Sequence, residues 1–291
     1  MRVLIGAVMI SFSAVFVKLI NMGPTAIGFY RVFLAGVILA VYVRVRGDSL
    51  LKGRALILLL AAALFYAGDL WVWHQSIQWI GPGLATLLAA FQVFILTFVG
   101  VLFFKETASW RLLIAVPLAF LGLMLLVGVD WSILAPEKRA GVWLGLATGV
   151  FYAGYLLSLR EARARAKDSS AAGDLAMVSL GTAVLLAAVS LPMGETLKVT
   201  TVWDGTWLTT YAVASQVIAW VLISSSLPYV PASRAGLLLL LQPTLSFIWD
   251  ILFFDRPVAI HEGAGAVIAL FAIWLGSQRT DAVAVRSDRI T

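Results

Sequence analysis

The sequence predicts an all-α integral membrane protein with ten transmembrane helices, and three observations predict it. Hydrophobic residues make up 62% of the 291 residues and charged residues only 12%, whereas a soluble domain carries about 25% charged residues. The mean hydropathy is +0.98. Apolar stretches close to the roughly 20 residues that a helix needs to cross a bilayer recur along the chain.

The ten apolar stretches define the predicted helices and their order. They cover residues 3–20, 26–43, 55–74, 83–104, 111–128, 141–159, 174–192, 206–223, 234–254 and 260–277. Turn-forming residues separate them, as at Gly81-Pro82-Gly83. The stretches are continuously apolar and do not alternate, which favours helices over a transmembrane barrel.

The basic residues predict how the chain is oriented. Fifteen of the 21 Lys and Arg residues fall in the termini and loops of one side, five fall on the other side, and Arg31 lies within a predicted helix. The positive-inside rule then places both termini in the cytoplasm. We expect the membrane to be a bacterial-type inner membrane. Because the basic residues lie in short loops between apolar stretches, we expect the lipid bilayer and not nucleic acid as partner. Ten helices suffice for a monomer.

An internal repeat divides the chain into two halves. A shift of 150 aligns residues 73–127 with 223–277 at ten identical positions, among them Gln92 with Gln242. A shift of 139 likewise places the first predicted helix on the sixth.

We therefore expect two five-helix repeats, residues 1–130 and residues 141–291, the second ending in a cytoplasmic tail. Since five is odd, the two repeats are inverted relative to each other. Transporters of this architecture bind their substrates near the membrane midplane, at the interface between the repeats.

Three motifs carry a family resemblance. The predicted helix 26–43 contains Phe29-Tyr30-Arg31-Val32-Phe33, the helix 83–104 runs into Leu102-Phe103-Phe104-Lys105-Glu106, and Gln242-Pro243 lies inside the helix 234–254. Together they resemble the drug/metabolite transporter superfamily, in particular its ten-helix EamA-type members. Val93 departs from the pattern because it stands where a first-half proline would be, and Asp255-Arg256 replaces a second-half glutamate.

The resemblance implies a secondary transporter of small metabolites. Among characterised members, amino-acid exporters of the YddG type suggest neutral or aromatic amino acids as substrates. Sugar phosphates, nucleotide sugars and drug-like amphiphiles remain alternatives. A phosphate-bearing substrate would need several cations near the midplane, and the sequence places only one or two deep in the membrane.

Polar and aromatic side chains inside the predicted helices are the candidate substrate ligands. Gln92 and Gln242 lie near mid-bilayer, where an amide without a partner costs about 1–3 kcal/mol, so each must line a wet cavity or bond another helix. Phe12 and Phe16 are four residues apart and are expected on one face, as a clamp for an apolar side chain. The remaining aromatic candidates are Tyr152, Tyr155 and Trp220. Ordinary packing, or an interfacial belt for Trp220, is the alternative.

Five ionisable residues inside the predicted helices form the candidate gate or coupling set: Lys18, Arg31, Asp69, His74 and Asp250. With the predicted orientation they lie in the outer half of the membrane, where an unpaired charge is costly. They must pair or face water, and the two cations have the alternative of snorkelling to the interface. The two carboxylates are also candidates for carrying a coupling proton.

No residue pattern favours an enzyme, a metal site or a cofactor. The chain has no cysteine and only two histidines, which excludes thiolate ligands and argues against a histidine-built metal centre. His74 and His261 both lie near the ends of predicted helices, without an acidic cluster. We expect no catalytic residues, and an intramembrane enzyme, a receptor or a structural role is a weaker alternative to transport.

Overall fold

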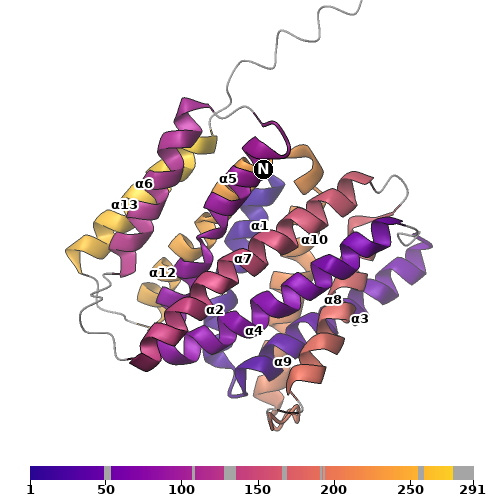
Figure 1. The fold of residues 1–291 in the computed structure, drawn as a ribbon. Coiled ribbons are helices and arrows are strands. Elements are labelled where there is room, and N and C mark those ends of the chain that lie inside the picture. Colours follow the sequence, from indigo (N-terminus) through magenta and orange to yellow (C-terminus); the bar gives the residue numbers. More distant parts are fainter. Residues whose placement is uncertain are drawn as a thin grey trace, which may run out of the picture.

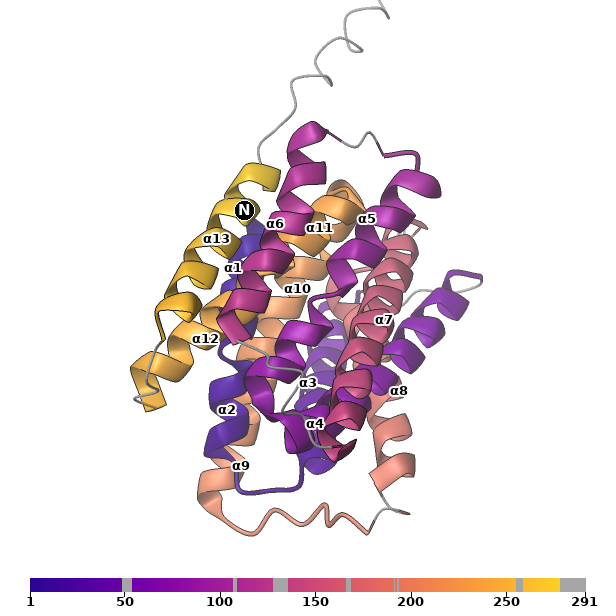
Figure 2. The same cartoon turned by 60° about the vertical axis from the view of Figure 1, so that its left-hand side comes forward.

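The computed structural model describes residues 1–48, 54–106, 109–127, 136–165, 169–190, 192, 194–254 and 259–277. These residues form a helical bundle without strands, drawn in Figures 1 and 2. Its elements are α1 (Arg2–Ser11), α2 (Ser13–Leu19), α3 (Pro24–Arg46), α4 (Arg54–Ala89), α5 (Gln92–Leu102), α6 (Trp110–Val127), α7 (Pro136–Arg165), α8 (Ala171–Ser190), α9 (Val202–Tyr211), the π-helix η2 (Ala212–Ile218), α10 (Ala219–Ser224), the 3-10 helix η3 (Leu227–Tyr229), α11 (Ala232–Leu239), α12 (Leu241–Phe254) and α13 (Ile260–Ser277).

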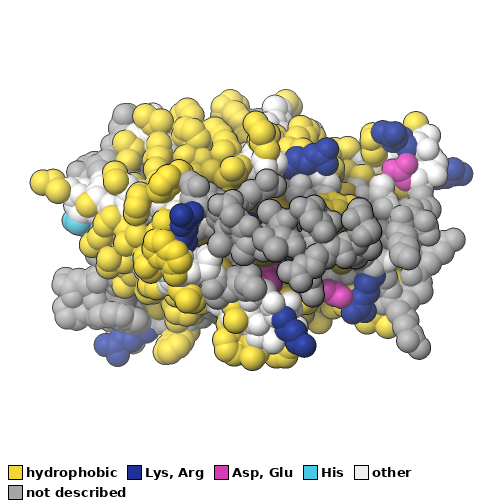
Figure 3. Space-filling view, turned by 90° about the horizontal axis from the view of Figure 1, so that it is seen from above, with side chains coloured by type: hydrophobic (Ala, Val, Ile, Leu, Met, Phe, Trp, Pro, Cys, Tyr) yellow, Lys and Arg dark blue, Asp and Glu magenta, His cyan; other side chains and the backbone are white. Residues whose placement is uncertain are grey.

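Seven helical segments are long and apolar enough to cross a membrane. They are Arg2–Leu19, Pro24–Arg46, Leu56–Ile80, Lys138–Arg165, Ala171–Ser190, Val202–Tyr229 and Ala232–Phe254. Three apolar helices are shorter: Gln92–Leu102, Trp110–Gly122 and Gly263–Gly276. Hydrophobic side chains cover much of the periphery of the molecule seen from above (Figure 3). The chain is therefore a multi-pass membrane protein, and the count of ten transmembrane helices stays a prediction.

The long helix α4 folds back on itself. The indole nitrogen of Trp73 donates to Thr86 Oγ1 at 3.3 Å, although 13 residues of straight helix would separate them by ~20 Å. Ser76 and Leu88 also both lie against Gly145 of α7. The reversal falls in the stretch that contains Gly81-Pro82-Gly83, where the sequence predicts a turn.

Three of the predicted helices are broken, which the sequence analysis did not anticipate. The first is interrupted at Phe12, between α1 and α2. The stretch 83–104 is interrupted after Ala89, where α4 ends and α5 begins at Gln92. The stretch 234–254 is interrupted at Leu240, between α11 and α12. The last break has a clear cause, since the ring of Pro243 removes a backbone donor and clashes with the carbonyl four residues before it.

The helices pack mainly in pairs from opposite halves of the chain. Helix α4 runs along α7, α3 along α8 and α6 along α13, while α5 packs on α11 and α1 on α10. Small residues permit the closest of these contacts. A Cβ added at Gly122 of α6 would lie 2.5 Å from the backbone nitrogen of Ala269 in α13. The central pairs thus hold the two halves together along their length.

Candidate functional site

Two adjoining cavities lie inside the bundle, where both halves of the chain meet. The first is lined by Ile10, Ser13, Arg31, Tyr66, Asp69, Leu70, Trp73, Thr86, Ala89, Thr148, Tyr152, Trp220 and Gln242. The second is lined by Thr86, Ala89, Ala90, Gln92, Tyr152, Leu239, Leu240, Gln242 and Pro243. Because four residues line both, we treat them as one central cavity. Water-sized molecules have about 50 Å³ of space in the first part and about 30 Å³ in the second.

Two of the helix breaks meet at this cavity. Ala90 and Leu240 are equivalent under the 150-residue shift, and both line the second part of it. Gln92 and Gln242 follow the breaks directly and also line it. A break in a helix frees backbone polar groups, which lipid cannot hydrogen-bond. Such a break is therefore tolerated inside a membrane where it is buried in protein or lines a water-filled cavity. The breaks therefore mark the cavity as a place where polar groups gather.

A hydrogen-bonded cluster surrounds the buried side chain of Arg31, which is 5% exposed. Its Nε donates to Gln216 Oε1 at 3.1 Å, and its Nη1 donates to the Tyr211 hydroxyl at 2.9 Å. The Tyr66 hydroxyl donates to the same Gln216 oxygen at 2.7 Å, and Gln216 Nε2 donates to Ser179 Oγ at 3.3 Å. Gln216 and Tyr211 thus hold the guanidinium group directly, and Tyr66 and Ser179 hold Gln216.

The π-helix η2 places the central member of this cluster. Gln216 lies on η2, in the middle of a stretch of seven residues between α9 and α10. Short π-helical segments often occur at functional sites. Ser215, its neighbour on η2, accepts a hydrogen bond from Ser13 Oγ of α2 at 3.4 Å. The irregular segment therefore presents polar side chains inward, beside the cavity.

Asp69 of α4 lines the same cavity without a partner. Its side chain is buried, at 8% exposure, and among the described residues it makes no hydrogen bond and no ion pair within 4.0 Å. A buried carboxylate normally pairs with a cation or is fully hydrogen-bonded. Here the Arg31 guanidinium lines the same cavity and is held by neutral groups from the second half of the chain.

Aromatic side chains form one wall of the cavity. Tyr66 stacks on Tyr155 with ring centroids 4.3 Å apart, and Tyr155 meets Trp220 edge-on at 4.8 Å. Tyr152 approaches Trp220 at 6.2 Å. Two polar atoms of the lining, the Trp220 indole nitrogen and Gln92 Oε1, are buried without a partner among the described residues, as is the hydroxyl of Tyr155 behind the lining. Since such atoms are rare in folded proteins, they point to a ligand or water at this position.

Six of the residues predicted from the sequence line the central cavity: Gln92, Gln242, Tyr152, Trp220, Arg31 and Asp69. Tyr155 lies behind the wall, fully buried against Tyr66 and Trp220.

Phe12 and Phe16 do not form the clamp that their spacing predicted. The ring of Phe12 stacks on Trp249 at 4.5 Å, whereas Phe16 packs against Trp207 and Tyr211. The helix break at Phe12 turns the two rings toward different helices, α12 and α9. Neither ring lines the central cavity.

Two other candidate gate residues, Lys18 and His74, do not line the cavity. Lys18 Nζ lies 4.3 Å from the ring centroid of Phe254. His74 is 1% exposed and lies against Gly28, and among the described residues neither of its ring nitrogens has a hydrogen-bond partner. Asp250 belongs to α12, but its side chain is outside the described residues.

Tyr66, Tyr211 and Gln216, which surround Arg31, are among the site residues that sequence reasoning missed. Gln216 carried the same signal as Gln92, an amide inside a predicted helix, and the rule for intramembrane polar residues would have selected it. Tyr66 and Tyr211 carried no such signal, because aromatic residues are common throughout these helices.

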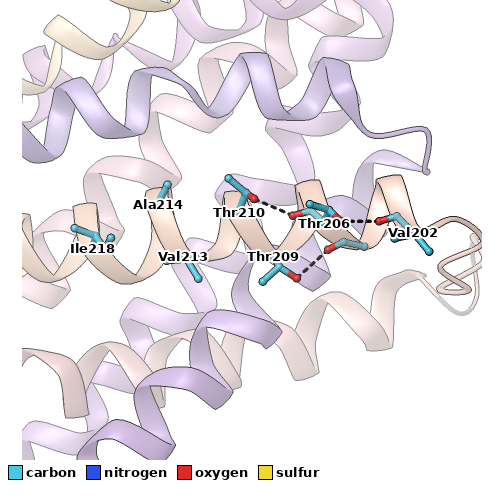
Figure 4. Close-up of a pocket in the computed structure, with 8 residues that line it drawn as sticks. Val202, Thr206, Thr209, Thr210, Val213, Ala214 and Ile218 are labelled. Carbon is cyan, nitrogen blue, oxygen red and sulfur yellow. Dashed lines mark hydrogen bonds between the residues drawn. The ribbon is translucent and has the colours of Figure 1, made fainter.

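A wider groove lies on the outer surface of α9 and η2 (Figure 4). It offers about 740 Å³ and is lined by Val202, Gly205, Thr206, Thr209, Thr210, Val213, Ala214 and Ile218. The hydroxyls of its three threonines each donate to the carbonyl four residues earlier in the helix. The three hydroxyl groups therefore donate within their own helix and not to a ligand, and the groove presents a mainly apolar surface.

Comparison with known proteins agrees with this architecture. A solved structure, described only as the crystal structure of a protein, superposes with a TM-score of 0.79 at 16% identity, and the match covers 95% of this chain and 97% of the other. No curated protein matches the sequence. The model of the EamA-like transporter family matches residues 1–128 and 139–277. The chain therefore belongs to the EamA-like transporter family.

Proposed function

We propose that this protein is a secondary transporter that exports neutral or aromatic amino acids by alternating access at the central cavity. Membership of the EamA-like family supports membrane transport of small molecules. The observation that carries the proposed site is the meeting of two equivalent helix breaks, with Gln92 and Gln242, at one buried cavity. The proposed location is a bacterial-type inner membrane, with both termini in the cytoplasm and the protein a monomer.

The helix pairing supports two inverted repeats of five helices. When each helix is replaced by its equivalent in the other half, the pairs α3–α8, α5–α11 and α6–α13 remain the same pairs. The pair α4–α7 becomes the pair α1–α10. The family model also matches two stretches of similar length, one in each half. A pseudo-symmetric pair of repeats around a central site is the architecture by which many transporters expose that site to either side in turn.

A carboxylate joins the two halves at each end of the bundle. Glu106 accepts hydrogen bonds from the backbone of Ala232 at 2.7 Å and from Ser233 Oγ at 2.8 Å. Glu195, in the connection between α8 and α9, accepts from Thr25 Oγ1 at 2.8 Å and from the Thr25 backbone at 3.1 Å. That connection lies at the opposite end of the bundle from the end of α5, which precedes Glu106 (Figure 2). Each carboxylate thus caps the first turn of a helix from the other half. We name these contacts the Glu106 latch and the Glu195 latch, and in alternating access each would open in turn.

The size of the cavity fits a closed state of such a cycle. Ligand pockets typically have about 300–1,000 Å³, and the space for water-sized molecules here is far smaller. With both latches formed, a substrate as large as an amino acid has no room, so the halves must separate to admit it. Substrate would then stabilise the states in which they are apart, through its greater affinity for them.

The chemistry of the lining favours amino acids over phosphate-bearing substrates. Arg31 is the only Lys or Arg among the described residues that line the cavity, whereas a phosphate group is usually bound by several cations or bidentate arginines. The wall of Tyr152 and Trp220 offers apolar surface to a side chain, and Gln92 and Gln242 offer both donors and acceptors. A drug-like amphiphile would use the same wall and is the second candidate substrate.

Transport by purified protein in liposomes tests the proposal. We expect saturable uptake of radiolabelled neutral and aromatic amino acids, and at least tenfold slower uptake by Gln92→Ala and Gln242→Ala. Thr209→Ala is the matched control, because Thr209 lies in the outer groove, and it should transport as the natural protein does. Folded protein that moves no amino acid would disprove the substrate assignment and leave the family in place.

A further inference from the structure

The central cavity holds one basic and one acidic side chain that do not pair with each other. Arg31 and Asp69 both line it, yet no hydrogen bond or ion pair within 4.0 Å joins their side chains. Inside a membrane protein, opposite charges usually pair directly, because each is costly to bury alone. The carboxylate without a partner and the fixed guanidinium therefore indicate that a ligand pairs with both.

The guanidinium is held in place by groups that do not neutralise it. Gln216 and Tyr211 accept from Nε and Nη1, and both are uncharged. Arg31 Nη2 donates no hydrogen bond to any of the described residues. The Arg31 charge thus keeps donors for an anionic group in the cavity, while its position is fixed by the second half of the chain.

We propose that Arg31 and Asp69 bind the two ends of one zwitterion, the guanidinium taking a carboxylate and the Asp69 carboxylate taking an ammonium group. This assignment rests on the proposed transport function and names the two residues that bind the charged ends of its substrate. Because Arg31 and Asp69 together carry no net charge, only a ligand with both groups leaves every charge in the cavity paired. A simple amine or a simple acid leaves one protein charge buried and alone, which is strongly unfavourable.

The surroundings of the pair fit the rest of such a ligand. Trp73, Tyr152 and Trp220 line the same cavity and provide apolar surface for a side chain. The indole nitrogen of Trp220 is buried and has no partner within the described part of the chain, so it is a further donor toward a carboxylate. The site therefore favours zwitterions with an apolar or aromatic side chain.

Three probes that share the phenyl side chain and differ in which charged groups they carry test the assignment: L-phenylalanine, 2-phenylethylamine and 3-phenylpropionate. Each competes against uptake of radiolabelled L-phenylalanine by the full-length protein in liposomes. We expect L-phenylalanine to compete about 100-fold better than either single-charge probe. If the amine and the acid compete as well as L-phenylalanine does, the zwitterion assignment is overturned while the proposed transport stands. If no zwitterion is taken up at all, the amino-acid function fails and this inference fails with it.

Asp69→Asn should reverse the preference between two ligands, a result that an unfolded protein cannot give. The variant loses the partner of the ammonium group, so 3-phenylpropionate should stabilise it against thermal unfolding in detergent more than L-phenylalanine does. The natural protein should show the reverse order, and Thr209→Ala should match the natural protein. An Asp69→Asn variant that keeps the natural affinity for L-phenylalanine and loses only its dependence on a proton gradient would overturn the inference and assign Asp69 to proton coupling.

Discussion

The side chain of Ser233 donates to the carboxylate of Glu106 at 2.8 Å, across 127 residues of sequence. The same carboxylate accepts from the backbone of Ala232 and lies 3.5 Å from Arg160 Nη2. Glu106 therefore caps α11 from outside the helix and joins the two halves of the chain. Carboxylates at a helix N-terminus are stabilised by the unpaired backbone donors and by the helix dipole.

Glu106→Ala should destabilise the protein by about 1–2 kcal/mol, as expected for the loss of a helix cap. Thermal unfolding in detergent measures the change. Glu161→Ala is the matched control, because its pair with Arg165 is largely exposed, at 30% and 58%, and such pairs contribute about 0–1 kcal/mol. Equal effects of the two substitutions would contradict a structural role for the Glu106 latch.

Opening one latch should change which side of the membrane can reach the cavity. The chain has no cysteine, so Ser13→Cys introduces a single thiol at the cavity lining. Adding Glu195→Ala weakens the latch on the predicted outer side, and a membrane-impermeant maleimide added from that side should label the thiol several times faster. Adding Glu106→Ala weakens the opposite latch and should slow this labelling. Equal labelling rates in both double variants would argue against alternating closure by the latches.

The fold was predicted from the sequence far better than the site. The apolar stretches predicted where the helices lie, because a helix that crosses a bilayer needs about 20 predominantly apolar residues in a row. The break at Leu240 was signalled by Pro243, but the break after Ala89 has no proline, since Val93 stands at the equivalent place. The role of Gln216 depends on the π-helix η2 and on a contact with Arg31 across 185 residues. Periodicity along the chain carries no information about such a contact.

Pro243→Ala should affect transport more than stability. The substitution restores a backbone donor and removes the clash that interrupts the helix at Leu240, so the protein should be as stable as before or more so. Uptake should slow, because the break lines the cavity. Pro117→Ala is the control, since Pro117 lies inside α6 with an exposed side chain. If both variants transport at the natural rate, the break is not needed for the cycle.

Gly122→Val should weaken the pairing of α6 with α13. An added Cβ would lie 2.5 Å from the backbone nitrogen of Ala269 and 2.8 Å from the carbonyl oxygen of Gly265. Because backbone atoms cannot move aside as a flexible side chain does, the two helices must separate, at a cost of about 1–3 kcal/mol. Gly263→Val is the matched control within α13, since no atom lies within 4 Å of the Cβ that would be added there. Thermal unfolding of both variants in detergent distinguishes close helix packing at Gly122 from the general effect of replacing glycine by a β-branched residue. Equal losses of stability in the two variants would mean that the contact between α6 and α13 does not depend on the absence of a side chain at Gly122.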